Sequence, residues 1–165
     1  MSQDNGELLM DACDHILGDP ALAPEFDKAG KLTKTHCNAA ALFVAQALGC
    51  GEFDSPGGRP LLADEMIAVM VANASGKWKV VTGSEATIHA LSGGLAYAAK
   101  TSGELGAAHG HIAVIYPVGM QRSGSWKADV PILANVGKTN GQVKTSEAFP
   151  VLRGQPSYFT WTENA

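Results

Sequence analysis

Cys37 is the residue whose type and position best support covalent chemistry. It follows Thr35 and His36 and opens an apolar run, residues 39–48, that Gly49 closes. Thr35 suits the N-cap position, the run predicts a helix, and Gly49 suits the position just after its end. The thiol would then lie in the first helical turn, where free backbone N–H groups and the helix dipole favour the thiolate. We therefore expect a nucleophilic cysteine.

The alternative is that Cys37 is a small core residue, as most free cysteines are. The predicted helix is apolar nearly all round, with only Gln46 as a long polar side chain, so it belongs in the core. The polar approach over residues 27–34 favours a thiol presented at a surface cleft. Cys13 and Cys50 have no comparable placement, and we expect them to be structural.

A thiol nucleophile needs a base, and imidazole is the usual one near neutral pH. His109 and His111 lie two residues apart, so both would point to the same side of an extended segment. Gly110 favours His111, because glycine permits a close backbone approach at the start of the strand. The apolar strand that follows is typical of a protein core. The alternative for His111 is an edge residue without a chemical role.

The third group expected is a polar residue that binds the far imidazole nitrogen and fixes its tautomer. Asn135 interrupts an otherwise apolar strand and needs a hydrogen-bonding partner there, which makes it the first candidate. Asn140 ranks behind Asn135, because the Asn140–Gly141 pair is typical of an ordinary turn. A polar cap at the end of a strand remains the alternative for Asn135.

The rest of the chain predicts the elements that would position these groups. Apolar residues recur at helical spacing in four segments, which we expect to be helices: 8–17, 37–48, 62–73 and 85–91. Runs bounded by turn residues predict strands at 78–81, 95–99, 110–116, 130–136 and 158–161. Segments 21–34 and 51–60 are expected to be loops, the second on the rim of the cleft.

The order of these elements predicts one α+β domain over residues 1–165. Helices come first, including the buried helix that carries Cys37, and an antiparallel sheet follows because its connections are short and turn-rich. One of these turns is expected at residues 117–119. We also expect a monomer.

Composition excludes several classes of function. The 165 residues carry a net charge of −4 with scattered cations, so nucleic acid is not an expected partner. Three cysteines suit neither a disulfide framework nor a zinc site, and no metal or cofactor is expected. No segment is long enough to span a membrane. Residues 1–7 are polar and acidic, unlike a secretory signal, so we expect synthesis in the cytosol.

This arrangement resembles the papain-like NlpC/P60 and CHAP cysteine peptidases of bacterial cell walls. The shared features are a cysteine that opens a buried helix, the Gly110–His111 pair before an apolar strand, and a later strand with a polar residue. Residues 78–99, 134–141 and 158–159 also resemble the small amidase effectors of type VI secretion. The likeness covers roughly residues 8–161.

The resemblance implies Cys37 as nucleophile and His111 as base. The third residue varies among these families, so Asn135, Asn140 or none stays open. His36 departs from the pattern: it would perturb the pKa of Cys37, contact substrate, or be a solvated residue of the first turn. The 51–60 loop has no counterpart in the families.

For function, the resemblance implies hydrolysis of an amide in the peptide part of peptidoglycan, most typically the bond from γ-D-glutamate to diaminopimelate. The protein would act in the periplasm or cell wall of a target bacterium. An injected antibacterial effector implies a cognate immunity protein as partner, whereas a phage-type endolysin implies none. An acyltransferase or transglutaminase-like enzyme and a non-catalytic binding module are the remaining hypotheses.

Overall fold

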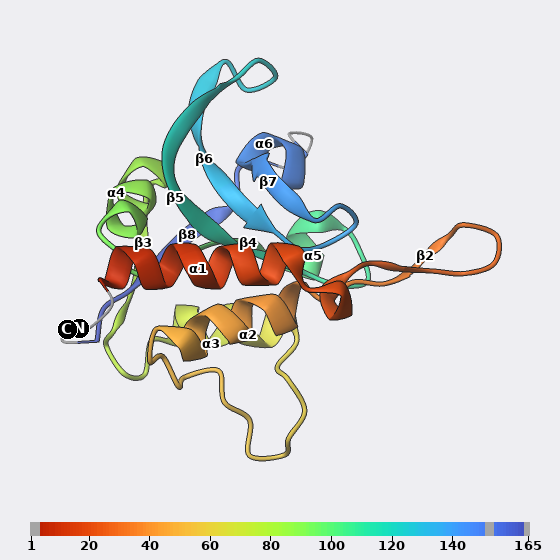
Figure 1. Ribbon diagram of the computed structural model, residues 1–165, viewed down its shortest axis with the longest axis horizontal. Helices are drawn as coiled ribbons and strands as arrows, with labels where there is room; N and C mark the ends of the chain where they lie inside the picture. Colours follow the sequence, from red (N-terminus) through yellow and green to blue (C-terminus); the bar gives the residue numbers. More distant parts are fainter. Residues whose placement is uncertain (1–3, 151–153, 164–165) are drawn as a thin grey trace.

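The structure is organised around an antiparallel sheet with strand order β3-β8-β4-β5-β6-β7 (Figure 1). The computed structural model describes residues 4–150 and 154–163. Within these residues, the strands of the sheet are β3 (Trp78–Val81), β4 (Ala96–Lys100), β5 (His111–Ser123), β6 (Ala128–Asn135), β7 (Gly141–Lys144) and β8 (Ser157–Trp161). The helices are α1 (Asn5–Gly18), η1 (Pro20–Leu22), α2 (Cys37–Ala47), α3 (Ala63–Ala72), α4 (Gly83–Leu91), α5 (Ser102–Leu105) and α6 (Thr145–Ala148). The expected α+β class with an antiparallel sheet is confirmed.

Helices cover both faces of the central strand β4. Tyr97 Oη donates a hydrogen bond of 2.7 Å to the Ala41 carbonyl of α2, so Tyr97 faces this helix. Its neighbour Ala98 pairs with Tyr158 of β8, and a Cβ at Gly83 of α4 would lie 3.2 Å from the Tyr158 ring. Because successive side chains of a strand point to opposite faces, α2 and α4 lie on opposite sides of the sheet.

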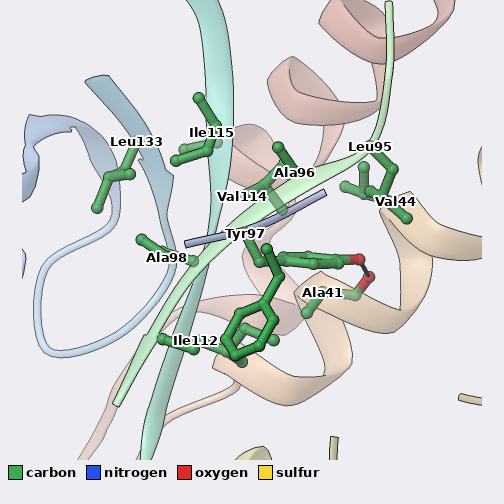
Figure 2. Close-up of a cluster of buried hydrophobic side chains, with 14 of the residues drawn as sticks. Ala41, Val44, Leu95, Ala96, Tyr97, Ala98, Ile112, Val114, Ile115 and Leu133 are labelled. Atoms are coloured by element: carbon green, nitrogen blue, oxygen red, sulfur yellow. Dashed lines mark hydrogen bonds between the residues drawn. The ribbon is translucent and has the colours of Figure 1, made fainter. Parts of the chain in front are cut away.

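The helix that carries Cys37 packs closely on the sheet because its buried residues are small. Ala40, Ala41, Val44 and Ala45 are buried, and Figure 2 shows Ala41 and Val44 facing the β4 side chains. The hydrogen bond from Tyr97 also satisfies a buried carbonyl, which would otherwise cost free energy. This packing fixes the first turn of α2 relative to the sheet.

The segment expected as a loop at 21–34 instead contains η1 and a hairpin of β1 (Glu25–Phe26) and β2 (Leu32–Lys34). At its tip, Asp27 Oδ1 accepts hydrogen bonds from the N–H groups of Ala29 and Lys31, both at 2.9 Å. Gly30 supplies a φ of +78°. These local hydrogen bonds close a turn that composition alone does not indicate.

The turn expected at 117–119 is also wrong, because β5 continues through these residues to Ser123. Its pairing with β6 shifts register between Ile115 and Met120. A bulge of this kind accommodates Pro117, which has no N–H to donate to a ladder. Beyond the bulge, β5 and β6 pair again as far as Ser123 and Ala128.

The first part of the 51–60 loop is tied to the core. Phe53 is fully buried and stacks on Trp78 with ring centroids 5.4 Å apart. The Glu52 carboxylate accepts hydrogen bonds of 2.8 Å from the indole N–H groups of Trp78 and Trp161. These contacts, from residues distant in sequence, hold the loop in place. Among the described helices, none is long and apolar enough to cross a bilayer.

Candidate functional site

Cys37 is the first residue of α2, and Gly49 follows the end of the helix with a φ of +77°. The N-cap, however, is His36 and not Thr35, because the chain becomes helical only after His36. The His36 side chain makes no cap hydrogen bond. It turns instead toward β1, where Nε2 lies 2.9 Å from Glu25 Oε1.

Cys37 is only 7% exposed, and this burial raises the pKa of its thiol above the ordinary value of 9.0. Hydrogen bonds from the backbone N–H groups of Ile112 and Asn38, together with the nearby N–H of Cys37 itself, lower the pKa in part. The expectation that the helix start favours the thiolate is therefore corrected, because desolvation is the larger effect. At neutral pH the group is a thiol surrounded by donors that would stabilise negative charge.

His111 and Asn135 are brought together by neighbouring strands. His111 begins β5, Asn135 ends β6, and His111 Nε2 lies 2.8 Å from Asn135 Oδ1. Asn135 Nδ2 donates a hydrogen bond of 2.7 Å to the Thr139 carbonyl, which fixes the orientation of the amide. Since Oδ1 can only accept, we assign the ring hydrogen to Nε2. His111 Nδ1 is then the nitrogen left free to accept a proton.

The His111 ring is held on two further sides. Phe149 packs against it with ring centroids 5.1 Å apart, and a Cβ at Gly137 would lie 3.2 Å from His111 Cε1. Burial lowers the pKa of His111 below 6.5, and the hydrogen bond with Asn135 raises it in part. The imidazole is therefore neutral at neutral pH, which is the form a general base requires.

No hydrogen bond joins the thiol to the imidazole within residues 4–150 and 154–163. The sulfur instead accepts from the N–H of Ile112, the residue after His111. Cys37 thus lies against the first residues of β5. Catalytic hydrogen bonds are often formed only in the complex with substrate.

The remaining polar candidates have other surroundings. Asn140 Nδ2 donates to the Leu22 carbonyl at 2.8 Å, while its Oδ1 accepts from the N–H of Gly137 at 3.0 Å. Asn140 therefore holds the loop beside the imidazole, and these hydrogen bonds go to partners other than His111. His109 is exposed and lies in the connection before β5, outside the strand that His111 begins, so the two histidines do not point to one side of a shared extended segment.

A cavity of about 450 Å³ opens beside Cys37. Three segments wall it in addition to the start of α2: residues 32–35 of the hairpin, residues 62–64 at the start of α3, and residues 108–110 before β5. No residue of the 51–60 loop lines it. The loop lies instead on a different cavity, lined by Asp54, Ser55, Gly58, Arg59 and Pro60. The rim beside Cys37 is formed by the hairpin and by the start of α3.

Gly110 is required for space, as the sequence indicates. A Cβ there would lie 2.3 Å from Asp64 Oδ1 and 2.9 Å from the Lys100 carbonyl. Asp64 lines the cavity and accepts a hydrogen bond of 2.8 Å from the Ser102 N–H. Gly110 therefore lets α3 approach the start of β5, which closes one side of the cavity.

Sequence reasoning missed several groups of this site. The Thr139 carbonyl, Gly137 and Phe149 orient the imidazole, and Asp64 and Lys34 are charged groups in the cavity wall. Of these groups, only Gly137 could have been indicated by the sequence, because it lies two residues after the candidate Asn135. The described residues contain no cluster of three or more acidic, histidine or cysteine side chains that could hold a metal ion. No protein-family model matches the chain, and no curated protein matches it significantly.

Proposed function

We propose that the protein is a cysteine amidase that uses Cys37 as nucleophile, His111 as general base and Asn135 as the residue that orients the imidazole. The observation that carries the proposal is the chain of hydrogen bonds from Thr139 through Asn135 to His111, placed one residue from the strand N–H that contacts the Cys37 sulfur. The adjoining cavity of about 450 Å³ provides room for a peptide segment.

The protonation states define the first step. Cys37 is a thiol and His111 a neutral imidazole, so His111 Nδ1 takes the thiol proton as the sulfur attacks the amide carbonyl. The backbone N–H groups around the sulfur stabilise the charge that develops there. His111 then gives the proton to the leaving amine, which departs as the thioester forms. Water, deprotonated by His111, cleaves the thioester and regenerates the thiol.

The substrate that we propose is an amide in the peptide part of peptidoglycan, most specifically the bond from γ-D-glutamate to diaminopimelate. Support comes from the resemblance to NlpC/P60 and CHAP peptidases and from the order of the elements, with a cysteine-bearing helix packed on an antiparallel sheet. The proposed site of action is the wall or periplasm of a target bacterium. An effector role, with a cognate immunity protein, is the leading form of the proposal, and a phage-type endolysin is its alternative.

A non-catalytic binding module is a second candidate, because Cys37 is buried and lacks a hydrogen bond with His111. The rate at which iodoacetamide modifies Cys37 in the native protein separates the two. Modification that slows in His111→Ala, which lacks the base, supports the amidase. A rate that stays as slow as that of the fully buried Cys13 favours the binding module.

Expression in two compartments of a Gram-negative host tests where the protein acts. Cytosolic protein should be tolerated because mature peptidoglycan is absent there, whereas protein fused to a periplasmic export signal should cause lysis. Lysis should be lost in Cys37→Ala, since the bond is broken by nucleophilic attack. Equal toxicity from both compartments, or periplasmic toxicity unchanged in Cys37→Ala, would contradict the proposal.

A further inference from the structure

The β1–β2 hairpin projects from the body of the protein, and its second strand returns directly to the candidate nucleophile (Figure 1). Residues 32–35 form one wall of the cavity beside Cys37. The tip of the hairpin is exposed, so the position of this wall depends on how the base of the hairpin is fixed.

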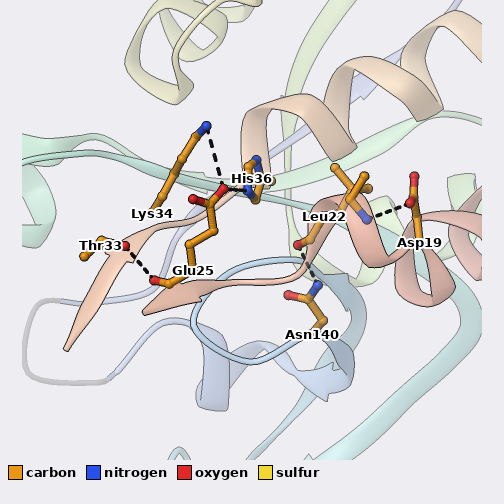
Figure 3. A network of polar contacts seen from close by, with 8 residues as sticks. Asp19, Leu22, Glu25, Thr33, Lys34, His36 and Asn140 are labelled. Carbon is orange, nitrogen blue, oxygen red and sulfur yellow. Dashed lines mark hydrogen bonds and ion pairs between the residues drawn. The ribbon is translucent and has the colours of Figure 1, made fainter. Parts of the chain in front are cut away.

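Glu25 makes the contacts that fix the base of the hairpin (Figure 3). Its carboxylate Oε1 lies 2.9 Å from His36 Nε2 and 3.8 Å from Lys34 Nζ. Its backbone carbonyl accepts a hydrogen bond of 3.0 Å from Thr33 Oγ1. A single residue of β1 therefore holds three positions of the segment that leads from the cavity wall into α2.

Helix capping does not explain why His36 contacts Glu25. His36 occupies the N-cap position, yet its side chain donates or accepts no cap hydrogen bond, and its ring is only 15% exposed. The ring thus packs beneath the hairpin base with one nitrogen directed at the carboxylate. Since His36 precedes Cys37, the pair couples the hairpin to the first turn of α2.

The chain just before β1 is held from the imidazole side of the site. Asn140 donates to the Leu22 carbonyl, three residues before Glu25, and accepts from Gly137, which packs beside the His111 ring. Figure 3 shows this contact next to the Glu25 cluster. The hairpin base is thereby attached to both halves of the candidate site.

We propose that Glu25 is a positioning residue: through His36 and Lys34 it fixes the hairpin wall of the cavity and so determines how tightly the substrate peptide is held beside Cys37. The inference rests on the proposed amidase function. In this role Glu25 does not contact the reacting atoms. Loss of the carboxylate should therefore weaken substrate binding and leave the chemical step nearly unchanged.

The kinetic test compares Glu25→Ala with Glu25→Gln and with the control Glu7→Ala, which removes another exposed carboxylate, on α1. Glu25→Ala should raise KM for a muropeptide by about fivefold, the upper range for an exposed ion pair, with kcat little changed. Glu25→Gln keeps an acceptor for His36 and should restore most of the loss. Glu7→Ala should behave as wild type.

A second measurement stays informative even when no muropeptide is cleaved. The rate at which N-ethylmaleimide modifies Cys37, located by mass spectrometry, reports how far the wall screens the thiol. Glu25→Ala should increase this rate about fivefold at an unchanged melting temperature. Equal modification rates in Glu25→Ala and wild type would overturn the positioning role. Faster modification without any hydrolysis by wild type would retain that role and reject the amidase function.

Discussion

The two halves of the candidate site are built differently. The imidazole side comprises His111, Asn135, Thr139 and Phe149, held by hydrogen bonds and ring packing from adjacent strands and the segments that follow them. The thiol side comprises Cys37 and the cavity walls, which come from three separate segments. The imidazole is oriented before any substrate binds, whereas the thiol depends on walls whose positions are set by distant contacts.

This difference suits separate roles for the two halves in the proposed mechanism. Ordered hydrogen bonds at Asn135 fix the tautomer of His111, and the proposed mechanism requires this one tautomer for proton transfer. The hairpin and the start of α3 shape the cavity and leave room for substrate recognition. Changes on the imidazole side should therefore affect mainly kcat, and changes in the walls should affect mainly KM.

The largest effect should come from removing either reacting group. Cys37→Ala and His111→Ala should each lower kcat by at least about a thousandfold, because nucleophile and base act as a unit. The double variant should be no worse than either single one. His109→Ala is the control and should leave kcat nearly unchanged, since His109 lies on the cavity wall, where changes should affect mainly KM. If the His109 and His111 variants exchange behaviour in a muropeptide hydrolysis assay, the base is assigned wrongly.

Asn135→Ala should have an intermediate effect. It removes the acceptor that orients the ring but leaves Nδ1 able to take a proton, so the loss in kcat should be about a hundredfold smaller than that of His111→Ala. Circular dichroism and the melting temperature check that the fold remains. A loss equal to that of Cys37→Ala in an unfolded protein would show that Asn135 is a structural group.

Changing Asn135 to aspartate should move the pH profile. Burial lowers the pKa of His111 below 6.5, so the acid limb of kcat/KM should lie below pH 6.5 in wild type. In Asn135→Asp a carboxylate faces Nε2–H and stabilises the imidazolium, which raises the pKa and moves the limb to higher pH. An unchanged limb would mean that a group other than His111 controls activity.

The same lowered pKa predicts how stability depends on pH. His111 of the unfolded chain binds a proton near pH 6.5, whereas His111 of the folded protein binds one only at lower pH. The contribution of His111 to stability is therefore fully present above pH 6.5. Stability should fall as the pH drops through 6.5 toward the lower folded pKa. Urea midpoints measured against pH should show this loss in wild type and less of it in His111→Gln. If the urea midpoints of wild type and His111→Gln depend on pH in the same way, the lowered pKa of His111 is contradicted.

The smallest effect should come from Gly137→Ala. The added Cβ would lie 3.2 Å from His111 Cε1, so the ring must move by a few tenths of an ångström. A decrease in kcat of about threefold with unchanged KM is expected, since even small displacements of a catalytic group are costly. Gly124→Ala is the matched control, because a Cβ there meets nothing within 4 Å. Equal kinetics for the two variants would show that the imidazole tolerates the shift.

The imidazole side was the more predictable from sequence. His111 at a strand start after Gly110, and Asn135 in an apolar strand, are local signals, and the hydrogen bond expected between such residues is present. The buried helix of Cys37 was likewise indicated by its apolar run. Secondary structure with strong periodicity and the antiparallel sheet followed from the same kind of pattern.

The thiol side was less predictable because its properties depend on tertiary contacts. The pKa of Cys37 is set by burial, which the helix pattern alone does not quantify, and desolvation outweighs the helix start. The cavity wall was missed because a turn closed by Asp27 carries no hydrophobic periodicity. The attachment of the 51–60 loop to the core was not predictable because Glu52 finds its tryptophan partners far along the chain.

The central claim is that Cys37 and His111 hydrolyse a peptidoglycan amide, and mass spectrometry of purified muropeptides tests it most directly. Incubation with the protein in oxygen-18-labelled water should release two fragments, one with a new carboxyl group that contains a solvent oxygen. Cys37→Ala should release neither. Intact muropeptides after incubation with wild type, or the same fragments from Cys37→Ala, would contradict the account. Cleavage that joins the acyl fragment to an added amine instead of solvent oxygen would identify an acyltransferase.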